Sequence, residues 1–102
     1  MVKLKFKHES MELLYRDKDY QDRRLPNELR RAYIKKCFIL ETLENIQDLK
    51  NYRGLNFEHY KDHYSIRVNN QRRIEFDYDS YKNITIIEVL DITNHYKKNF
   101  NR

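Results

Sequence analysis

The stretch YSIRVNNQRRIEFDY, residues 64–78, has the pattern of a β-hairpin. Every second position on both sides of its polar centre is apolar: Tyr64, Ile66 and Val68 before it, and Ile74, Phe76 and Tyr78 after it. Because successive side chains of a strand point to opposite faces, one face of this hairpin is apolar and the other is charged. The stretch therefore predicts a sheet that packs one face on a hydrophobic core and carries arginines and acids on the other.

The two apolar sets share a face only if the turn has an odd number of residues. We expect the turn to be residues 70–72, because asparagine at its first position tolerates a left-handed backbone. This register places Arg67 opposite Glu75 and Arg73 opposite Asn69. An exposed cross-strand ion pair would explain one such arginine. Three arginines within seven residues instead favour a site for an RNA or DNA backbone, because guanidinium groups fit phosphate oxygens.

The segments on the N-terminal side of the hairpin predict one strand and two helices. VKLKF, residues 2–6, alternates apolar residues with lysines and is typical of a short strand. Ser10 is a suitable N-cap for a short helix that ends near Arg16. Beyond a polar connector, Pro26 fits the first turn of a long amphipathic helix, which we expect to end near Leu49.

The C-terminal half predicts mainly strands. We expect them at residues 55–59, 63–69, 73–79 and 84–92. The last, ITIIEVLDI, is so apolar that we expect both of its faces to be covered, as in a central strand. The predicted fold class is α+β, in a single domain over residues 1–102. A short N-terminal strand and two helices would pack on an antiparallel sheet of four to five strands.

Composition limits the classes of protein to which this chain can belong. A formal net charge of +5 over 102 residues suits one domain with a polyanionic partner, without identifying that partner. The single cysteine, Cys37, excludes a disulfide framework and a cysteine-rich metal site. No apolar run is long enough to span a bilayer, and the N-terminal MVKLKFKH lacks the core of a signal peptide. We therefore expect a cytoplasmic protein with no membrane partner.

Two further stretches hold residues that suit chemistry. NHYKK, residues 94–98, places an imidazole, a phenol and two ammonium groups after the last predicted strand; taken alone, it is more typical of a basic terminus. FEHYKDHY offers Glu58, His59 and Lys61 near a turn, and is otherwise a polar loop. The four histidines lack a metal-ligand spacing such as HExxH, and Gly54 stands alone, so there is no glycine-rich phosphate loop. We expect neither a metal nor another cofactor.

The chain resembles the RelE/ParE toxin superfamily, specifically its HigB-like branch, in three stretches in the same order: GLNFEHYKD, YSIRVNNQRRIEF and EVLDITNHYKK. The resemblance covers residues from about 26 to 98 and implies a compact α+β toxin of a type II toxin–antitoxin system. The antitoxin would be a helix-turn-helix, HigA-like protein, through which alone the toxin would reach operator DNA. RelE- and HigB-like relatives cut mRNA in the A site of the 70S ribosome. The alternatives are a ParE-like inhibitor of DNA gyrase and a basic nucleic-acid-binding domain without catalysis.

The resemblance also implies which residues are catalytic. Glu58 matches a carboxylate or histidine of the RNA-cleaving relatives, and Arg73 matches their arginine before the I-x-F strand. His95 and Tyr96 match a terminal His-Tyr pair. In metal-free attack by the RNA 2′-hydroxyl, Glu58 would be the base and His95 the acid. Arg73, aided by Arg67, would stabilise the negative charge of the phosphorane, while Tyr96 would orient the phosphate or stack on a base.

Other basic residues are expected to contact the RNA: Arg67, Arg72, Lys61, Lys97 and Lys98. We expect the Arg73 side chain to face solvent, so that its removal would leave the fold intact.

Three features depart from the family pattern. The K-G-D-x-x-G turn of relatives is shortened to residues 61–63, and an aromatic usually occupies the position of Arg72. If relatives ending in D-Y-H are the better template, residues 91–93 align there and no histidine matches.

Overall fold

The computed structural model describes residues 2–23, 25–60 and 62–94. In chain order these form β1 (Val2–Phe6), α1 (Glu9–Arg16), α2 (Asn27–Thr42), the 3₁₀-helix η1 (Ile46–Asn51), β2 (Glu58–Tyr60), β3 (His63–Arg67), β4 (Arg72–Tyr81) and β5 (Ile84–Asn94). The described strands make one sheet in the order β1-β5-β4-β3-β2. Strand β1 runs parallel to β5, and the other neighbours are antiparallel. The predicted α+β fold class is confirmed.

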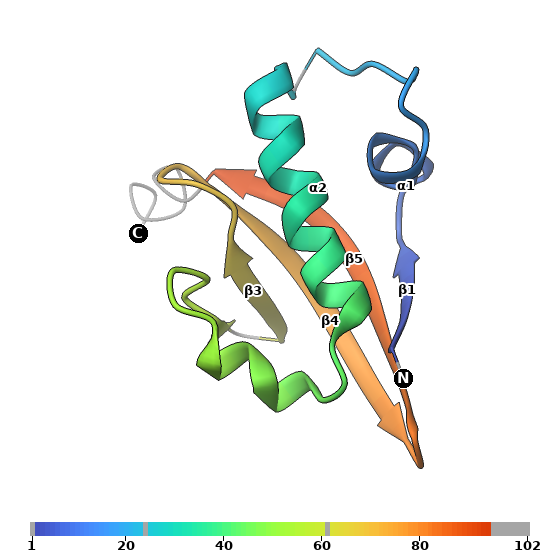
Figure 1. The fold of residues 1–102 in the computed structure, drawn as a ribbon, viewed down its shortest axis with the longest axis vertical. Helices are drawn as coiled ribbons and strands as arrows, with labels where there is room; N and C mark the ends of the chain where they lie inside the picture. Colours follow the sequence, from blue (N-terminus) through green and yellow to red (C-terminus); the bar gives the residue numbers. More distant parts are fainter. Residues whose placement is uncertain (1, 24, 61, 95–102) are drawn as a thin grey trace.

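The hydrophobic core lies between α2 and one face of the sheet. Figure 1 shows α2 lying across β4 and β5. The buried side chains of α2 meet the apolar sets of three strands: Leu29, Tyr33, Cys37 and Leu40 from the helix, and Ile66, Ile74, Phe76, Ile87 and Val89 from the sheet. The apolar face predicted for the hairpin is therefore the face that packs on the helices.

Polar contacts join α1 to α2 beside this core. The buried hydroxyl of Tyr33 donates to the carbonyl of Met11 at 2.7 Å. The guanidinium of Arg30 donates to the carbonyls of Leu14 at 3.1 Å and Asp17 at 2.6 Å, and also to that of Tyr20. Because the last carbonyls of a helix have no intrahelical partner, Arg30 satisfies groups that α1 and its connector leave open.

The long helix expected between Pro26 and Leu49 is wrong in its second part. Helix α2 ends at Thr42, and Leu43 has an extended backbone with ψ of 142°. The side chain of Asn45 then accepts a hydrogen bond from the amide of Gln47 at 2.9 Å and begins η1. Leu43, Ile46 and Leu49 are all buried, so the three-residue spacing of a 3₁₀-helix continues the apolar pattern through the break.

Strand β5 is internal to the sheet, but the expectation that both of its faces are covered is wrong. Ile87 and Val89 are fully buried on the helix-bearing face. Ile84 and Ile86, on the other face, are 48% and 39% exposed. Apolar composition alone therefore overstated the burial of this strand.

The hairpin has the predicted three-residue turn, shifted by one position. Ile66 pairs with Ile74 and Arg67 with Arg73, so the turn is residues 69–71. The side chain of Asn69 accepts hydrogen bonds from the amide of Gln71, the last residue of the turn, at 2.9 Å, and from that of Arg72, the first residue of β4, at 2.8 Å. The expected pairing of Arg67 with Glu75 is therefore wrong. A shift of one residue in the turn moves each pairing by two, so the apolar and charged faces are preserved.

No helix within the described ranges is both long enough and apolar enough to span a bilayer.

Candidate functional site

A polar cluster lies on the sheet face away from α2. We call this the polar face; across β2, β3 and β4 it carries Glu58, Ser65, Arg67, Arg73 and Glu75. Glu58 pairs with Ser65, and Ser65 with Glu75, so these three lie in one row across the sheet. Arg67 and Arg73 form the next row. The hairpin that builds the core on one side thus builds this cluster on the other.

Arg73 lies on the predicted face, but the expectation that its side chain faces solvent is wrong. The residue is only 6% exposed. Its Nε donates to Ser65 Oγ at 2.9 Å, and Nη2 donates to the carbonyls of Ser65, at 3.3 Å, and Asn56. Burial lowers the pKa of Arg73, while the charge of Glu58 raises it and that of Arg67 lowers it. The guanidinium is therefore embedded in the protein and is held mainly by neutral acceptors.

The segment before β2 closes over this guanidinium. Asn56 has a φ of 46°, a left-handed conformation that asparagine adopts more readily than most residues. Its carbonyl accepts from Arg73, and the neighbouring carbonyl of Leu55 accepts from the amide of Arg67. Glu58 follows two residues after Asn56, and its Oε1 lies 3.8 Å from Arg73 Nη2. Arg73 therefore also positions the segment that carries Glu58.

Arg67 is the more accessible of the two arginines. Its Nε donates to the carbonyl of Asn69 at 3.2 Å, and Nη2 donates to the side-chain oxygen of Asn70. These contacts orient the guanidinium over the hairpin turn, directly across from Arg73. Two like charges in one cross-strand pair repel each other, and a bound anion would relieve that repulsion. The pair is consequently suited to a phosphate.

The structure brings together three of the predicted site residues: Glu58, Arg67 and Arg73. Arg72 lies apart from them, because alternation along β4 turns its side chain to the helix-bearing face. There it lines a pocket of about 210 Å³ with Met11, Leu25, Leu29, Asp91 and Ile92. The other predicted residues, Lys61, His95, Tyr96, Lys97 and Lys98, lie outside the described residues.

Sequence reasoning missed a histidine–aspartate pair on the polar face. The Nδ1 of His63 lies 2.8 Å from Asp77 Oδ1, with side chains 47% and 42% exposed. The signal that could have found it is the hairpin register, since counting outward from Ile66 and Ile74 places these two residues opposite each other. His59 differs, because its ring stacks on Tyr64 with centroids 4.4 Å apart.

No group of three or more potential metal ligands occurs in the parts of the chain that the structure describes.

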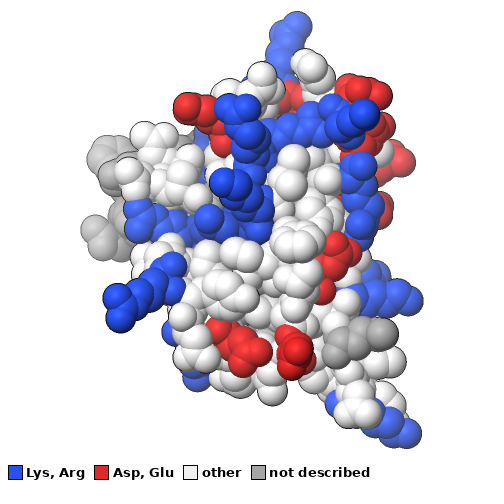
Figure 2. Space-filling model, viewed as in Figure 1, with Lys and Arg blue, Asp and Glu red and all other residues white. Residues whose placement is uncertain are grey.

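Basic residues also gather on the helix-bearing side. Figure 2 shows lysines and arginines in the upper half and on the left of this face, with acidic residues beside them at the upper left and along the right and others at the lower centre. Arg31 and Lys35 are exposed on α2. The helix-bearing face therefore also offers exposed positive charge, with acidic residues among the basic ones.

Comparison with known proteins identifies a family. A family model described as RelE-like toxin of type II toxin-antitoxin system HigB, of the HigB-like toxins, matches residues 4–95. A search of curated proteins returned no match.

Proposed function

Because this chain belongs to the HigB-like family of RelE-like toxins, we propose that it is an endoribonuclease that cuts mRNA on the ribosome. The family match itself makes the chain a toxin of a type II toxin–antitoxin system, with a cognate antitoxin as its partner. The proposed activity is metal-independent attack of the RNA 2′-hydroxyl on the adjacent phosphate, which would inhibit translation. The proposed partners are the 70S ribosome with its mRNA and a helix-turn-helix antitoxin of the HigA type.

The observation that carries the proposal is an exposed carboxylate beside the guanidinium of Arg73, which has a second arginine as its cross-strand partner. Glu58 lies 3.8 Å from Arg73, with Arg67 in the neighbouring position. A surface that only binds a nucleic-acid backbone gains from uniform positive charge. On the polar face the row of arginines instead lies beside rows that carry the acids Glu58, Glu75 and Asp77. Groups that can exchange protons beside groups that bind phosphate favour catalysis over binding alone.

The geometry supports a division of roles between the two arginines. Arg67 is the group placed to contact phosphate oxygens directly, because its guanidinium lies at the surface over the turn. Arg73 contributes positive charge from a buried position, where its Nε and Nη2 donate to Ser65 and Asn56. Glu58, whose side chain is 54% exposed, would take the proton from the 2′-hydroxyl. A positioned base of this kind contributes about 10²–10⁴-fold to the rate.

Cleavage also needs a proton donor for the leaving 5′ oxygen. His95 is the candidate that family resemblance supplies, and His63 is the candidate on the described polar face. Tyr96 is proposed to orient the phosphate or stack on a base, and Lys61, Lys97 and Lys98 to contact RNA. Arg72 is not included in the proposed phosphate site, because its side chain lies on the other face of the sheet.

Mapping mRNA ends after induction tests this function. The protein is induced in cells without its antitoxin, and new 5′ ends are sequenced across the transcriptome. We expect cuts within translated regions that follow the reading frame, and purified protein should cut mRNA on 70S ribosomes but barely touch free RNA. Glu58→Gln serves as the inactive control. Intact mRNA with gyrase-linked DNA breaks would instead support a ParE-like inhibitor.

A further inference from the structure

The pair formed by His63 and Asp77 lies beside the proposed phosphate site. On β3, His63 precedes Ser65 by two residues and so shares its face. That spacing is about 7 Å along a strand. Glu58 pairs with Ser65 on the neighbouring strand, which makes it a diagonal neighbour of His63. The imidazole and the carboxylate of Glu58 therefore flank the position of Ser65, to which Arg73 is bonded.

The contact with Asp77 determines which nitrogen of the imidazole faces solvent. An ionised carboxylate accepts hydrogen bonds and cannot donate, so the proton between the two groups belongs to Nδ1 of His63. No second partner of the ring is found among the described residues, and the side chain is 47% exposed. Nε2 is thus the nitrogen that can exchange a proton with a substrate. A carboxylate that fixes the ring in this way is the arrangement by which aspartate orients a catalytic histidine.

Neither Glu58 nor His59 is placed to supply the proton that the leaving 5′ oxygen needs. Glu58 is assigned to the 2′-hydroxyl, and one group cannot accept that proton and protonate the 5′ oxygen at the same instant. His59 stacks on Tyr64, a residue that packs against the core, and its ring lies on the helix-bearing side of the sheet. Within the described chain, His63 is the histidine on the polar face with an orienting partner.

We propose that His63, oriented by Asp77, donates the proton to the leaving 5′ oxygen; the proposal rests on the nuclease function proposed above. The 2′ oxygen forms a bond to phosphorus as its proton passes to Glu58. The bond from phosphorus to the 5′ oxygen breaks, and that oxygen takes the proton from Nε2 of the imidazolium. The products are a 2′,3′-cyclic phosphate and a 5′-hydroxyl. His63 is left neutral, with its remaining proton on Nδ1 and shared with Asp77, and is reprotonated from solvent.

A substrate with sulfur in place of the 5′ bridging oxygen at the mapped cut site tests this role. A thiolate leaves without being protonated, because a thiol is far more acidic than an alcohol. On ribosomes carrying the ordinary mRNA, His63→Gln should slow single-turnover cleavage by about 10²–10⁴-fold. On the sulfur substrate the same variant should cleave at close to the wild-type rate. Glu58→Gln should remain slow on both substrates.

Asp77 is a positioning residue, and its neighbour Asp79 offers a matched control. Asp79 is exposed and lies two residues further along the same face of β4. Asp77→Ala should slow cleavage of the ordinary mRNA, and the sulfur substrate should restore its rate. Asp77→Asn, which keeps an acceptor for Nδ1, should recover part of the rate. Asp79→Asn, which makes the same change of charge, should leave the rate unchanged. All variants should bind ribosomes with wild-type affinity.

Two outcomes would overturn the proposal in distinguishable ways. If His63→Gln cleaves normally while His95→Gln is slow and is rescued by the sulfur substrate, the donor is His95 and the nuclease function stands. If the wild-type protein leaves ribosome-bound mRNA intact, the proposed function fails, and the role of His63 fails with it.

Discussion

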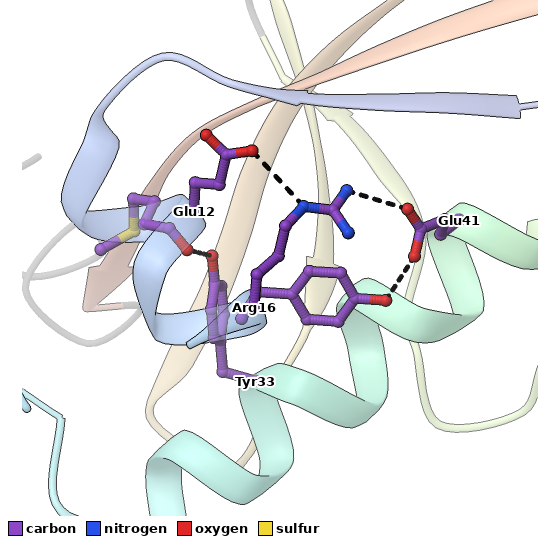
Figure 3. Close-up of polar contacts among 6 residues, drawn as sticks. Glu12, Arg16, Tyr33 and Glu41 are labelled. Carbon is purple, nitrogen blue, oxygen red and sulfur yellow. Dashed lines mark hydrogen bonds and ion pairs between the residues drawn. The ribbon is translucent and has the colours of Figure 1, made fainter. Parts of the chain in front are cut away.

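Two arginine–glutamate pairs in this molecule differ in which partner is held by further hydrogen bonds. Between the helices, Arg16 of α1 meets Glu41 of α2 at 2.9 Å, and Glu12 lies 3.4 Å from the same guanidinium (Figure 3). The hydroxyl of Tyr15 donates to the other oxygen of Glu41 at 2.6 Å. Both oxygens of this carboxylate are therefore occupied. On the polar face, Arg73 and Glu58 are 3.8 Å apart, and it is the arginine that is held in place, by hydrogen bonds from its Nε and Nη2.

The difference in exposure shows what each pair can do. Arg16 and Glu41 have side chains 43% and 31% exposed, so both are moderately accessible and bound to each other. The side chains of Arg73 and Glu58 are 7% and 54% exposed. A carboxylate with both oxygens occupied joins two helices. A carboxylate that is free at the surface, above a fixed cation, remains available to a substrate.

The largest expected effect comes from Arg73→Ala, which should reduce both stability and activity. Its removal leaves the Ser65 hydroxyl and the Asn56 carbonyl without their partner, at a cost of about 2–4 kcal/mol in the free energy of unfolding. Arg16→Ala is the matched control and should cost only about 0–1 kcal/mol, because an exposed pair contributes little. Urea denaturation measures both. Equal losses for the two variants would contradict the contrast drawn between the pairs.

Glu58→Gln should separate activity from stability. Because this side chain is mostly exposed, we expect the free energy of unfolding to change by no more than about 0.5 kcal/mol. Cleavage on ribosomes should fall by about 10²–10⁴-fold, since the base is lost. Single-turnover kinetics and denaturation on the same preparation provide the test. A variant that unfolds more easily would show that Glu58 also supports the sheet.

Arg67→Ala should weaken cleavage by about 10²-fold, because one donor to the phosphate is removed. Its contacts are with the hairpin turn, so we expect little change in stability. Arg72→Ala is the control from the same hairpin, because that side chain lies on the other face. Cleavage assays should distinguish the two variants. Similar losses for both would indicate that the RNA contacts the turn from either side.

Glu41→Gln should have a smaller effect, confined to stability. The change weakens the contact with Arg16 and alters the bond from Tyr15, so we expect a loss of about 1 kcal/mol or less. Cleavage should be unchanged. The thiol of Cys37 offers the measurement: burial raises its pKa to about 12, so it should react with alkylating agents only when the protein opens. If Glu41→Gln gave both faster alkylation of Cys37 and slower cleavage of mRNA, the contact between α1 and α2 would also affect the activity of the polar face.

The smallest expected effect is the pH dependence of the same contact. The hydrogen bond from Tyr15, and then Arg16, lowers the pKa of Glu41 below its ordinary value. A carboxyl group with a lowered pKa in the folded state contributes stability above its unfolded pKa of about 4.3, and that stability is lost as pH falls through the folded pKa. Glu41→Gln should therefore lose less stability on acidification than the wild type. Denaturation at pH 6 and at progressively lower pH would measure the difference.

Local pattern determined much of this molecule. Alternation along residues 64–78 was sufficient to predict a hairpin with one apolar and one charged face, because side-chain direction along a strand depends only on parity. The same rule placed Arg67 and Arg73 on one face together. The strand at the N-terminus and the order of helices and strands also followed from periodicity. Three stretches of sequence indicated the family that the comparison then identified.

Tertiary structure decided the features that depend on which distant groups meet. The turn is an exception, because its bonds are local: a three-residue turn fits two registers of equal parity, and in the observed one the side chain of Asn69 accepts from amides two and three positions further on. The end of α2 at Thr42 could not be seen in the apolar pattern, because an α-helix and a 3₁₀-helix both bury a residue at every third or fourth position. Arg73 is buried by Asn56, which lies 17 positions away, and His63 meets Asp77 from 14 positions away. Burial and hydrogen bonding depend on how the folded chain lies in space, so the burial of Arg73 could not be predicted from a local pattern. The pair of His63 with Asp77 could be predicted only once the register of the hairpin was known.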